Sequence, residues 1–143
     1  MAGTVKAANA AWEALLHAQV ALTRRFTDDD IWGEFSIREY DVLYTVAKHP
    51  DGIRLSKLNR SVLLSQPALS RLVDRLTERG LLERKPAPGD GRGVVVCMTD
   101  EGRSVQKTLG RRHAREVDDA LAGLTADELE TLRELCERIA APN

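Results

Sequence analysis

The sequence has few cysteines and no long apolar segment. Its 143 residues include only two cysteines, Cys97 and Cys136, which is too few for a disulfide scaffold and predicts buried, inert thiols. No apolar run approaches the roughly 18 residues that a membrane helix needs, and the mixed stretch after Lys6 lacks a signal-peptide pattern. These absences predict a cytoplasmic protein with no membrane partner.

Motifs of the common enzyme classes are also missing. The sequence contains no HExxH, GxSxG or GxxxxGK[ST] pattern. Its three histidines are far apart along the chain: His17, His49 and His113. We therefore expect a protein that is not an enzyme, with no metal site and no cofactor.

The residues that are present have the composition of one globular domain with an uneven charge distribution. The chain is 43% hydrophobic and 30% charged, and a chain of this length buries roughly two-thirds of its unfolded surface. Residues 54–92 hold nine basic and four acidic residues, a local charge of +5, whereas the remainder carries −6. A basic segment of this kind predicts a surface that binds a polyanion.

Apolar spacing and capping signals predict six helices. The first follows from apolar residues at helical intervals over residues 5–26. Two others begin at capping boxes, in which a Ser or Thr and a Glu three residues later each accept a hydrogen bond from the other's amide. The expected starts of the five later helices are Ser36, Ser56, Ser65, Thr99 and Thr125.

Strand signals fall between these helices. A short strand is expected at residues 53–55, and residues 82–86 and 93–97 flank a turn at 87–92 that is rich in glycine and proline. This order of elements predicts a winged helix, in which a two-stranded hairpin, the wing, follows two steeply crossed helices. A long charged turn is costly to order, so its tip is expected to contact a partner.

The helix after Ser65 has a polar face with the side chains that read duplex DNA. A major groove is about wide enough for one helix, where Gln pairs with adenine and Arg with guanine. Ser bonds a phosphate or a base edge, and the amides of a helix N-terminus suit a phosphate. The candidate DNA-binding residues here are Ser65, Gln66, Pro67, Ser70, Arg71, Asp74 and Arg75. The alternative is an ordinary solvated helix face.

The acidic candidates need a different role from the basic ones. Asp74 would repel phosphate unless it accepts from a cytosine amino group or orients Arg71 or Arg75. In the wing, Arg92 is a candidate for insertion into a narrow minor groove, and Asp90 would orient the turn or Arg92. The alternative is that Asp90 and Arg92 only decorate a glycine-rich turn.

Together these motifs resemble the MarR family of transcriptional regulators over nearly the whole chain. Residues 65–84 match the family's recognition helix, which ends in the pattern LxxxGL. Residues 90–92 match the DxR pattern of the wing, and residues 98–102 match the LTxxG pattern that opens the fifth helix. The departures are Met98 for leucine, Leu63 for a frequent glycine and Asn59 for alanine.

The resemblance implies a homodimer, built from the terminal helices, that binds a palindromic operator in double-stranded DNA. It implies one MarR-like domain over residues 1–143. A winged helix-turn-helix lobe would span 36–98, and a helical dimerisation region would span 1–35 and 99–143. The apolar stripes of the first and last helices independently favour a twofold interface. The alternative is that they pack on each other within one chain.

Family members are often repressors released by small ligands, and the resemblance implies a crevice near the first, second and fifth helices. Aromatic walls with a few polar groups suit a small aromatic or phenolic effector. The candidate effector-binding residues are Trp12, His17, Trp32, Tyr40 and Tyr44. The sequence thus predicts a mainly α protein with a small β wing that acts as an effector-released repressor. The alternative is a winged-helix module that binds protein and not DNA.

Overall fold

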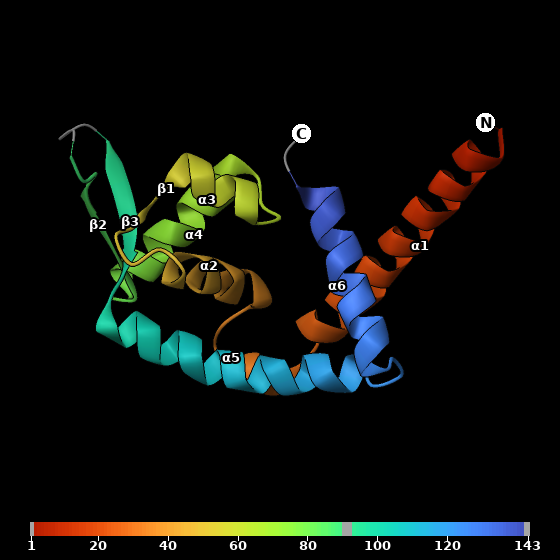
Figure 1. Cartoon of the computed structure of the whole chain (residues 1–143). Helices are drawn as coiled ribbons and strands as arrows, with labels where there is room; N and C mark the ends of the chain where they lie inside the picture. Colours follow the sequence, from red (N-terminus) through yellow and green to blue (C-terminus); the bar gives the residue numbers. More distant parts are fainter. Residues whose placement is uncertain (1, 90–92, 142–143) are drawn as a thin grey trace. The chain divides into compact units, whose positions relative to one another are not determined.

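The computed structural model describes residues 2–89 and 93–141 and is mainly helical with one small sheet (Figure 1). The elements in chain order are α1 (Ala2–Thr27), the 3-10 helix η1 (Asp30–Trp32), α2 (Ile37–Ala47), β1 (Ile53–Arg54), α3 (Leu55–Ser61), α4 (Gln66–Glu78), β2 (Leu82–Pro86), β3 (Val94–Met98), α5 (Asp100–Ala120) and α6 (Ala126–Ala140). The six predicted helices are confirmed, whereas η1 was not predicted. The chain divides into two compact units, residues 1–113 and 114–143, and α5 contributes to both.

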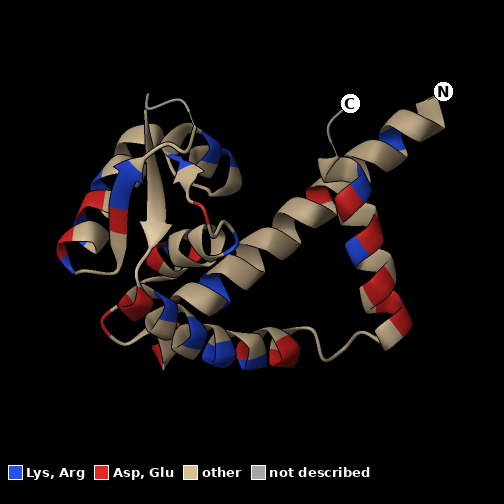
Figure 2. Cartoon of the chain, turned by 60° about the vertical axis from the view of Figure 1, so that its left-hand side comes forward, with Lys and Arg blue, Asp and Glu red and all other residues tan. Residues whose placement is uncertain are grey.

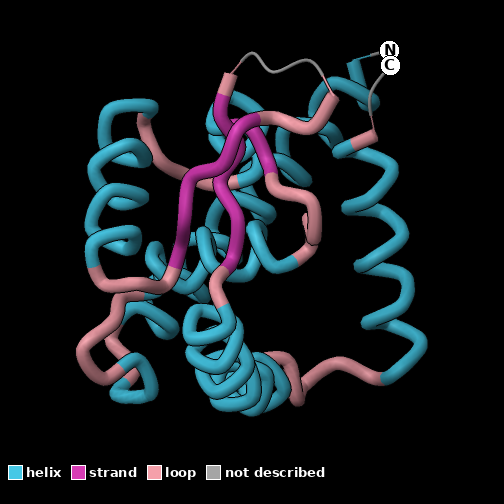
Figure 3. Tube along the Cα trace, turned by 90° about the vertical axis from the view of Figure 1, so that its left-hand side faces the viewer, coloured by secondary structure: helices cyan, strands magenta, loops and turns pink. Residues whose placement is uncertain are grey.

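The three strands form one antiparallel sheet in the order β1-β3-β2 (Figure 3). β2 and β3 make the wing, whose ladder runs from Leu82 opposite Met98 to Pro86 opposite Val94. β1 pairs with the other edge of β3. The wing is therefore hydrogen-bonded to the segment that leads into α3, which fixes its base relative to the helices.

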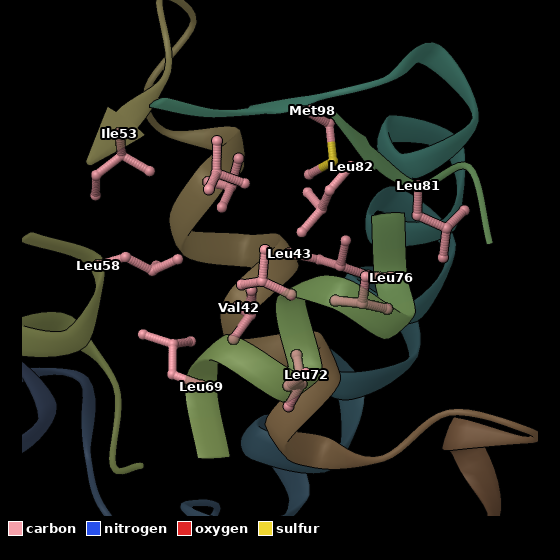
Figure 4. Packing of buried hydrophobic residues seen from close by; sticks show 13 residues of the cluster. Val42, Leu43, Ile53, Leu58, Leu69, Leu72, Leu76, Leu81, Leu82 and Met98 are labelled. Carbon is pink, nitrogen blue, oxygen red and sulfur yellow. The ribbon is translucent and has the colours of Figure 1, made fainter. Parts of the chain in front are cut away.

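Side chains from α2, α3 and α4 pack with those of the sheet in one hydrophobic core (Figure 4). Four apolar side chains recur at helical spacing along one side of α4 and are buried, with exposed fractions of 0 to 4% for Leu69, Leu72, Val73 and Leu76. Burying one such side chain contributes roughly 1.5–3 kcal/mol. This stripe anchors α4 in the core and leaves its opposite face to solvent.

Three helices have side-chain N-caps at the residues that the sequence predicted. Ser36 with Glu39, and Thr125 with Glu128, form complete capping boxes at α2 and α6. Ser65 caps α4, since its hydroxyl oxygen accepts a hydrogen bond from the Ala68 amide at 3.2 Å. Each cap satisfies amides that have no partner inside the helix.

The predicted start of the third helix was wrong. Ser56 does not cap α3, which begins at Leu55 after Arg54, and the Arg54 side chain makes no capping bond. Ile53 and Arg54 are held in an extended conformation by pairing with β3. The helix begins directly after that pairing ends, and Ser56 falls inside its first turn.

Helices α1 and α6 contain no buried residue. Their exposed large apolar side chains are Val5, Trp12, Leu15, Leu16 and Val20 on α1, and Leu129, Leu132, Leu135 and Ile139 on α6. In the second unit, Leu124, Leu132 and Leu135 line a groove of about 410 Å³. Several exposed large apolar side chains along one helix are typical of an interaction site, and this holds for each of the two helices by itself.

The two cysteines differ in their surroundings. Cys97 is buried beside Ala87 and Val95 in the wing, as predicted, whereas Cys136 is only partly buried. The prediction for Cys136 was wrong because α6 packs no face into a core. Among the described helices, none combines the length and hydrophobicity that a membrane span requires.

Candidate functional site

The predicted DNA-binding residues of α4 lie together at its N-terminal end and on its solvent-exposed side. Exposed members are Ser65, Gln66, Pro67, Arg71, Asp74 and Arg75, and Ser70 is half-buried. Pro67 stands in the first turn, where its missing amide costs no helical hydrogen bond. The Ser65 hydroxyl is already engaged as the cap, so this residue has a structural task at the site.

Asp74 has a partner that the sequence did not indicate. Its carboxylate forms an ion pair with the Arg84 guanidinium of β2 at 2.7 Å, whereas the sequence suggested Arg71 or Arg75 as the group it would orient. Both side chains of the pair are about half exposed, at 52% for Asp74 and 41% for Arg84. The pair links the polar face of α4 to the wing and neutralises the acid that would otherwise repel a phosphate.

The wing tip residues Asp90 and Arg92 lie outside the described residues. The described flanks show a tight hairpin base, in which the Ala87 amide donates to the Gly93 carbonyl at 3.1 Å. Gly93 has a positive φ of 81°, a backbone conformation that side-chain-bearing residues rarely adopt. Position 93 therefore requires glycine.

The basic residues that the structure describes between positions 54 and 89 are on the surface. Arg54, Lys57, Arg60, Arg71, Arg75, Arg79, Arg84 and Lys85 are all exposed. Lys and Arg occur both on the wing and on the helices beside it (Figure 2). The basic side chains predicted from the sequence thus lie at the surface, and Arg79, Arg84 and Lys85 among them form ion pairs with nearby carboxylates.

Three of the five predicted effector residues lie together. The ring centroids of Trp32 and Tyr40 are 5.3 Å apart, and those of Tyr40 and Tyr44 are 5.9 Å apart. Trp12 and His17 lie on α1 and are exposed, and among the described residues no ring contact joins them to this group. The structure therefore separates the five candidates into an aromatic cluster and two surface residues of α1.

His113 of α5, which was not among the predicted effector residues, also belongs to the aromatic cluster. Its ring packs against Phe26, Trp32 and Tyr40 at centroid distances of 4.9, 5.2 and 5.4 Å. Burial lowers the pKa of His113 below its ordinary value of 6.5, although nearby carboxylates oppose this. Its Nδ1 is buried and has no hydrogen-bond partner in the described part of the chain. The surroundings favour a neutral imidazole.

A groove of about 400 Å³ lies beside Tyr44, lined in part by Asp41, Lys48 and Leu63. The Lys48 ammonium lies 4.3 Å from the centre of the Tyr44 ring, a cation–π contact. Burial raises the pKa of Asp41, and Arg38 acts against that rise. This mixture of aromatic and charged groups suits a small polar ligand more than a metal. Within residues 2–89 and 93–141, no three potential metal ligands gather.

These features define a winged helix-turn-helix protein whose buried α4 stripe supports an exposed polar face. The sequence pattern of the MarR family matches residues 35–93, and the chain belongs to that family. The HTH-type transcriptional regulator PecS of Dickeya dadantii is 31% identical over 108 residues, which are 74% of this chain and 65% of PecS.

Two further comparisons cover different extents of the chain. The multiple antibiotic resistance protein MarR of Salmonella typhimurium is 36% identical over 84 residues, 58% of each protein. The solved structure of the transcriptional regulator PcaV from Streptomyces coelicolor in complex with its natural ligand is 32% identical. That match covers 90% of this chain and 87% of PcaV with a TM-score of 0.66. The matches to PecS and MarR span less than two thirds of those curated relatives.

Proposed function

We propose that this protein is a transcriptional regulator that binds an operator in double-stranded DNA through α4 and the wing. The observation that carries this proposal is the division of α4 into two faces. Four apolar side chains hold the helix in the core, while its amide, guanidinium and hydroxyl groups face solvent. A helix supported in this way presents a fixed set of polar groups to a major groove.

Individual residues then have separate tasks. Gln66 and Arg71 are the base readers, since amide and guanidinium groups make bidentate contacts with adenine and guanine. Arg75 and the amides at the start of α4 bind phosphates and set the register. Arg92 enters the minor groove, and Asp90 orients it.

We further propose that the protein acts as a homodimer on a palindromic site. The exposed apolar side chains of α1 and α6 support this, because neither helix buries a residue in the single chain. Residues 1–35 and 99–143 would form the dimerisation region and residues 36–98 the DNA-binding lobe. A twofold axis would place two α4 helices about one turn of DNA apart.

The regulator is expected to be a cytoplasmic repressor that a small aromatic or phenolic effector releases. Support comes from the cluster of Trp32, Tyr40 and Tyr44 beside the groove of about 400 Å³, and from PcaV, whose structure contains a natural ligand. Trp12 and His17 are exposed on α1 and do not line this groove.

Selection of bound duplexes from random DNA tests the proposal. The parent protein should enrich a palindromic consensus. The variants Gln66→Ala and Arg71→Ala should each lose about 1–3 kcal/mol of discrimination at one base pair of each half-site. Arg111→Ala, which removes an exposed arginine of α5, is the matched control and should return the parent consensus. Failure of the parent to enrich any sequence would favour the protein-binding alternative.

A further inference from the structure

A second group of basic residues lies on α5, outside the segment that carries the proposed DNA-binding surface. Between Glu101 and Glu116 the helix contains no acidic residue and five basic ones: Arg103, Lys107, Arg111, Arg112 and Arg115. Figure 2 shows successive Lys and Arg segments along this helix. The net charge of −6 outside residues 54–92 conceals the group, because the surplus acids lie elsewhere in the chain.

Three of these residues form a row on the side of α5 that faces away from the core. Arg103, Lys107 and Arg111, here called the α5 row, follow one another at four-residue intervals and so share one helix face. Leu109 is buried in a cluster with Tyr40. Lys107 and Arg111 are each two residues from Leu109, about 200° around the helix axis, and project to the opposite side. Both are exposed, and Arg103 is partly exposed.

The charges of the α5 row are not neutralised within the described part of the chain. None of the ion pairs there includes Arg103, Lys107 or Arg111. The row instead places like charges four residues apart, an arrangement that destabilises a helix. This unfavourable pattern stands on a face that supports no core packing, and a bound polyanion would offset the repulsion.

The spacing of the row suits the backbone of a nucleic acid. Four residues of an α-helix rise about 6 Å, and every second phosphate of one DNA strand lies about 7 Å further along the duplex axis. Three cations in a line can therefore each approach a phosphate of the same strand. Contacts of this kind supply most of the affinity in non-specific DNA binding.

Other polyanionic partners fit this face less well. A helix that lies on a membrane surface buries an apolar side in the lipid, but the apolar side of α5 is packed into the core through Val105 and Leu109. Protein interfaces are centred on aromatic and other apolar side chains and contain little lysine. Over α5, all of which the structure describes, no large apolar side chain is exposed.

Helix α2 separates the α5 row from the polar face of α4. Val42 and Leu43 of α2 pack with the buried stripe of α4, whereas Tyr40 of α2 packs with Leu109 of α5. Figure 1 shows α2 between the two helices. Because packed helices lie about 8–10 Å apart, two such layers separate the axes of α4 and α5 by roughly 16–20 Å. A straight duplex that lies along α4 therefore does not reach the row.

We propose that the α5 row binds the phosphate backbone of a second DNA segment while α4 and the wing hold the first. One protein molecule then joins two segments of DNA. Phosphate contacts carry no sequence information, so loss of the row leaves the selected consensus unchanged. The joining of two segments rests on the proposed function, whereas the binding of a phosphate backbone by the row does not.

The test uses a row variant and a control with the same change of charge. The row variant combines Arg103→Gln, Lys107→Gln and Arg111→Gln, since glutamine has about the helix propensity of arginine and lysine. The control replaces two arginines and one lysine that are exposed on α1: Lys6→Gln, Arg24→Gln and Arg25→Gln. Thermal unfolding should show the row variant at least as stable as the parent, because it loses like-charge repulsion. A lower melting temperature would give the row a structural role and overturn the proposal.

Binding by the row alone is measured in a protein that also carries Arg71→Ala, Arg75→Ala and Arg92→Ala, which remove proposed contacts of α4 and the wing. A labelled duplex of arbitrary sequence is titrated by fluorescence anisotropy at several low salt concentrations. The row substitutions should weaken binding by about tenfold or more and should reduce the log–log salt slope by about 2.7, or about 0.9 for each of three phosphates. The control substitutions should change neither quantity. Equal binding with and without the row substitutions would overturn the proposal.

A second arm measures the joining of two duplexes. The selected duplex is immobilised, loaded with protein and incubated at low salt with the labelled duplex of arbitrary sequence. The parent and the control should retain the labelled duplex, and the row variant should retain at least about fivefold less of it. The row variant should still bind the immobilised duplex as the parent does. Equal retention by the parent and the row variant would contradict the joining.

The outcomes separate this proposal from the proposed function. Row-dependent binding of the arbitrary duplex, without any selected consensus, would contradict the proposed function and leave the row as a DNA contact. A selected consensus with no row-dependent binding would contradict the row alone. Row-dependent binding to phosphatidylglycerol vesicles, with none to the duplex, would assign the row to a membrane surface and overturn the proposal.

Discussion

Replacement of Gly102 by alanine should destabilise the fold, although glycine-to-alanine changes usually stabilise helices. Gly102 is a buried residue in the first turn of α5. A Cβ there would lie 2.7 Å from the Met98 sulfur and 2.9 Å from the Leu81 carbonyl carbon, and still closer to the Leu81 oxygen. The obstacle includes backbone, which cannot rotate away as a flexible side chain does.

Two opposing effects determine how much Gly102→Ala changes the free energy of unfolding. On an open helix the change would gain about 1 kcal/mol, whereas forcing extra atoms into a packed site typically costs about 1–3 kcal/mol. The Leu81 carbonyl also accepts from the Thr99 amide at 3.2 Å, and the Thr99 hydroxyl donates to the Gly80 carbonyl at 2.7 Å. Because a shift of Leu81 strains this junction, we expect the upper end of the cost and a net loss of about 2 kcal/mol.

Urea unfolding followed by circular dichroism, at one fixed protein concentration, measures this change. Gly3→Ala on α1 is the control, since nothing lies within 4 Å of the added Cβ, and it should be as stable as the parent or slightly more stable. Unfolding of Gly102→Ala at the same urea concentration as the parent, or at a higher one, would show that the Leu81 backbone does not obstruct a Cβ at this position.

Three further predictions concern the core, the His113 site and the ion pair at α4. Leu58→Ala, at a fully buried position, should lower the free energy of unfolding by about 2–5 kcal/mol in the same urea assay; a smaller loss would contradict tight packing there. Burial lowers the pKa of His113 in the folded protein, although the charges of Asp41 and Asp29 act in the opposite direction. The imidazole therefore binds a proton more readily in the unfolded chain than in the folded one. The free energy of unfolding is therefore not reduced by protonation of His113 above about pH 6.5, and it falls as the pH drops below this value. Melting temperatures between about pH 8 and pH 5 should show that decline in the parent and a weaker decline in His113→Phe, and identical profiles would exclude the assignment. A double-mutant cycle of Asp74→Ala and Arg84→Ala should give a coupling free energy below about 1 kcal/mol in urea unfolding, because both side chains are half exposed. A larger coupling would show that this ion pair contributes substantially to the stability of the fold.

The sequence predicted those parts of the fold that depend on local chemistry. The α4 stripe at Leu69, Leu72, Val73 and Leu76 has helical spacing, and spacing alone indicates which side is buried. A glycine just after a helix is typical of a left-handed C-terminal position, and Gly80 after α4 has a φ of 76°. There its amide donates to the Thr77 carbonyl and the Leu81 amide donates to the Leu76 carbonyl, both at 3.0 Å, which closes the helix end.

The parts that the sequence could not predict depend on contacts between distant segments. The pair of Asp74 with Arg84 requires the register of the wing against α4, which no local pattern encodes. A cavity of about 340 Å³ is lined by residues 32–35 and by Ser104, Val105, Thr108, Leu109 and Arg112 of α5, two segments that are far apart in the sequence. A signal for His113 did exist, because it follows Val105 and Leu109 at four-residue intervals on the apolar side of α5. A polar residue on such a stripe indicates a buried group with a specific environment.

The salt dependence of DNA binding tests most directly whether the exposed face of α4 and the basic wing engage a duplex. Fluorescence anisotropy with a labelled duplex from the selection gives the association constant over a series of salt concentrations. The logarithm of the association constant should fall linearly with the logarithm of the salt concentration, with a slope that corresponds to several phosphate contacts. Absence of binding at low salt, or an affinity that does not change with salt, would contradict it.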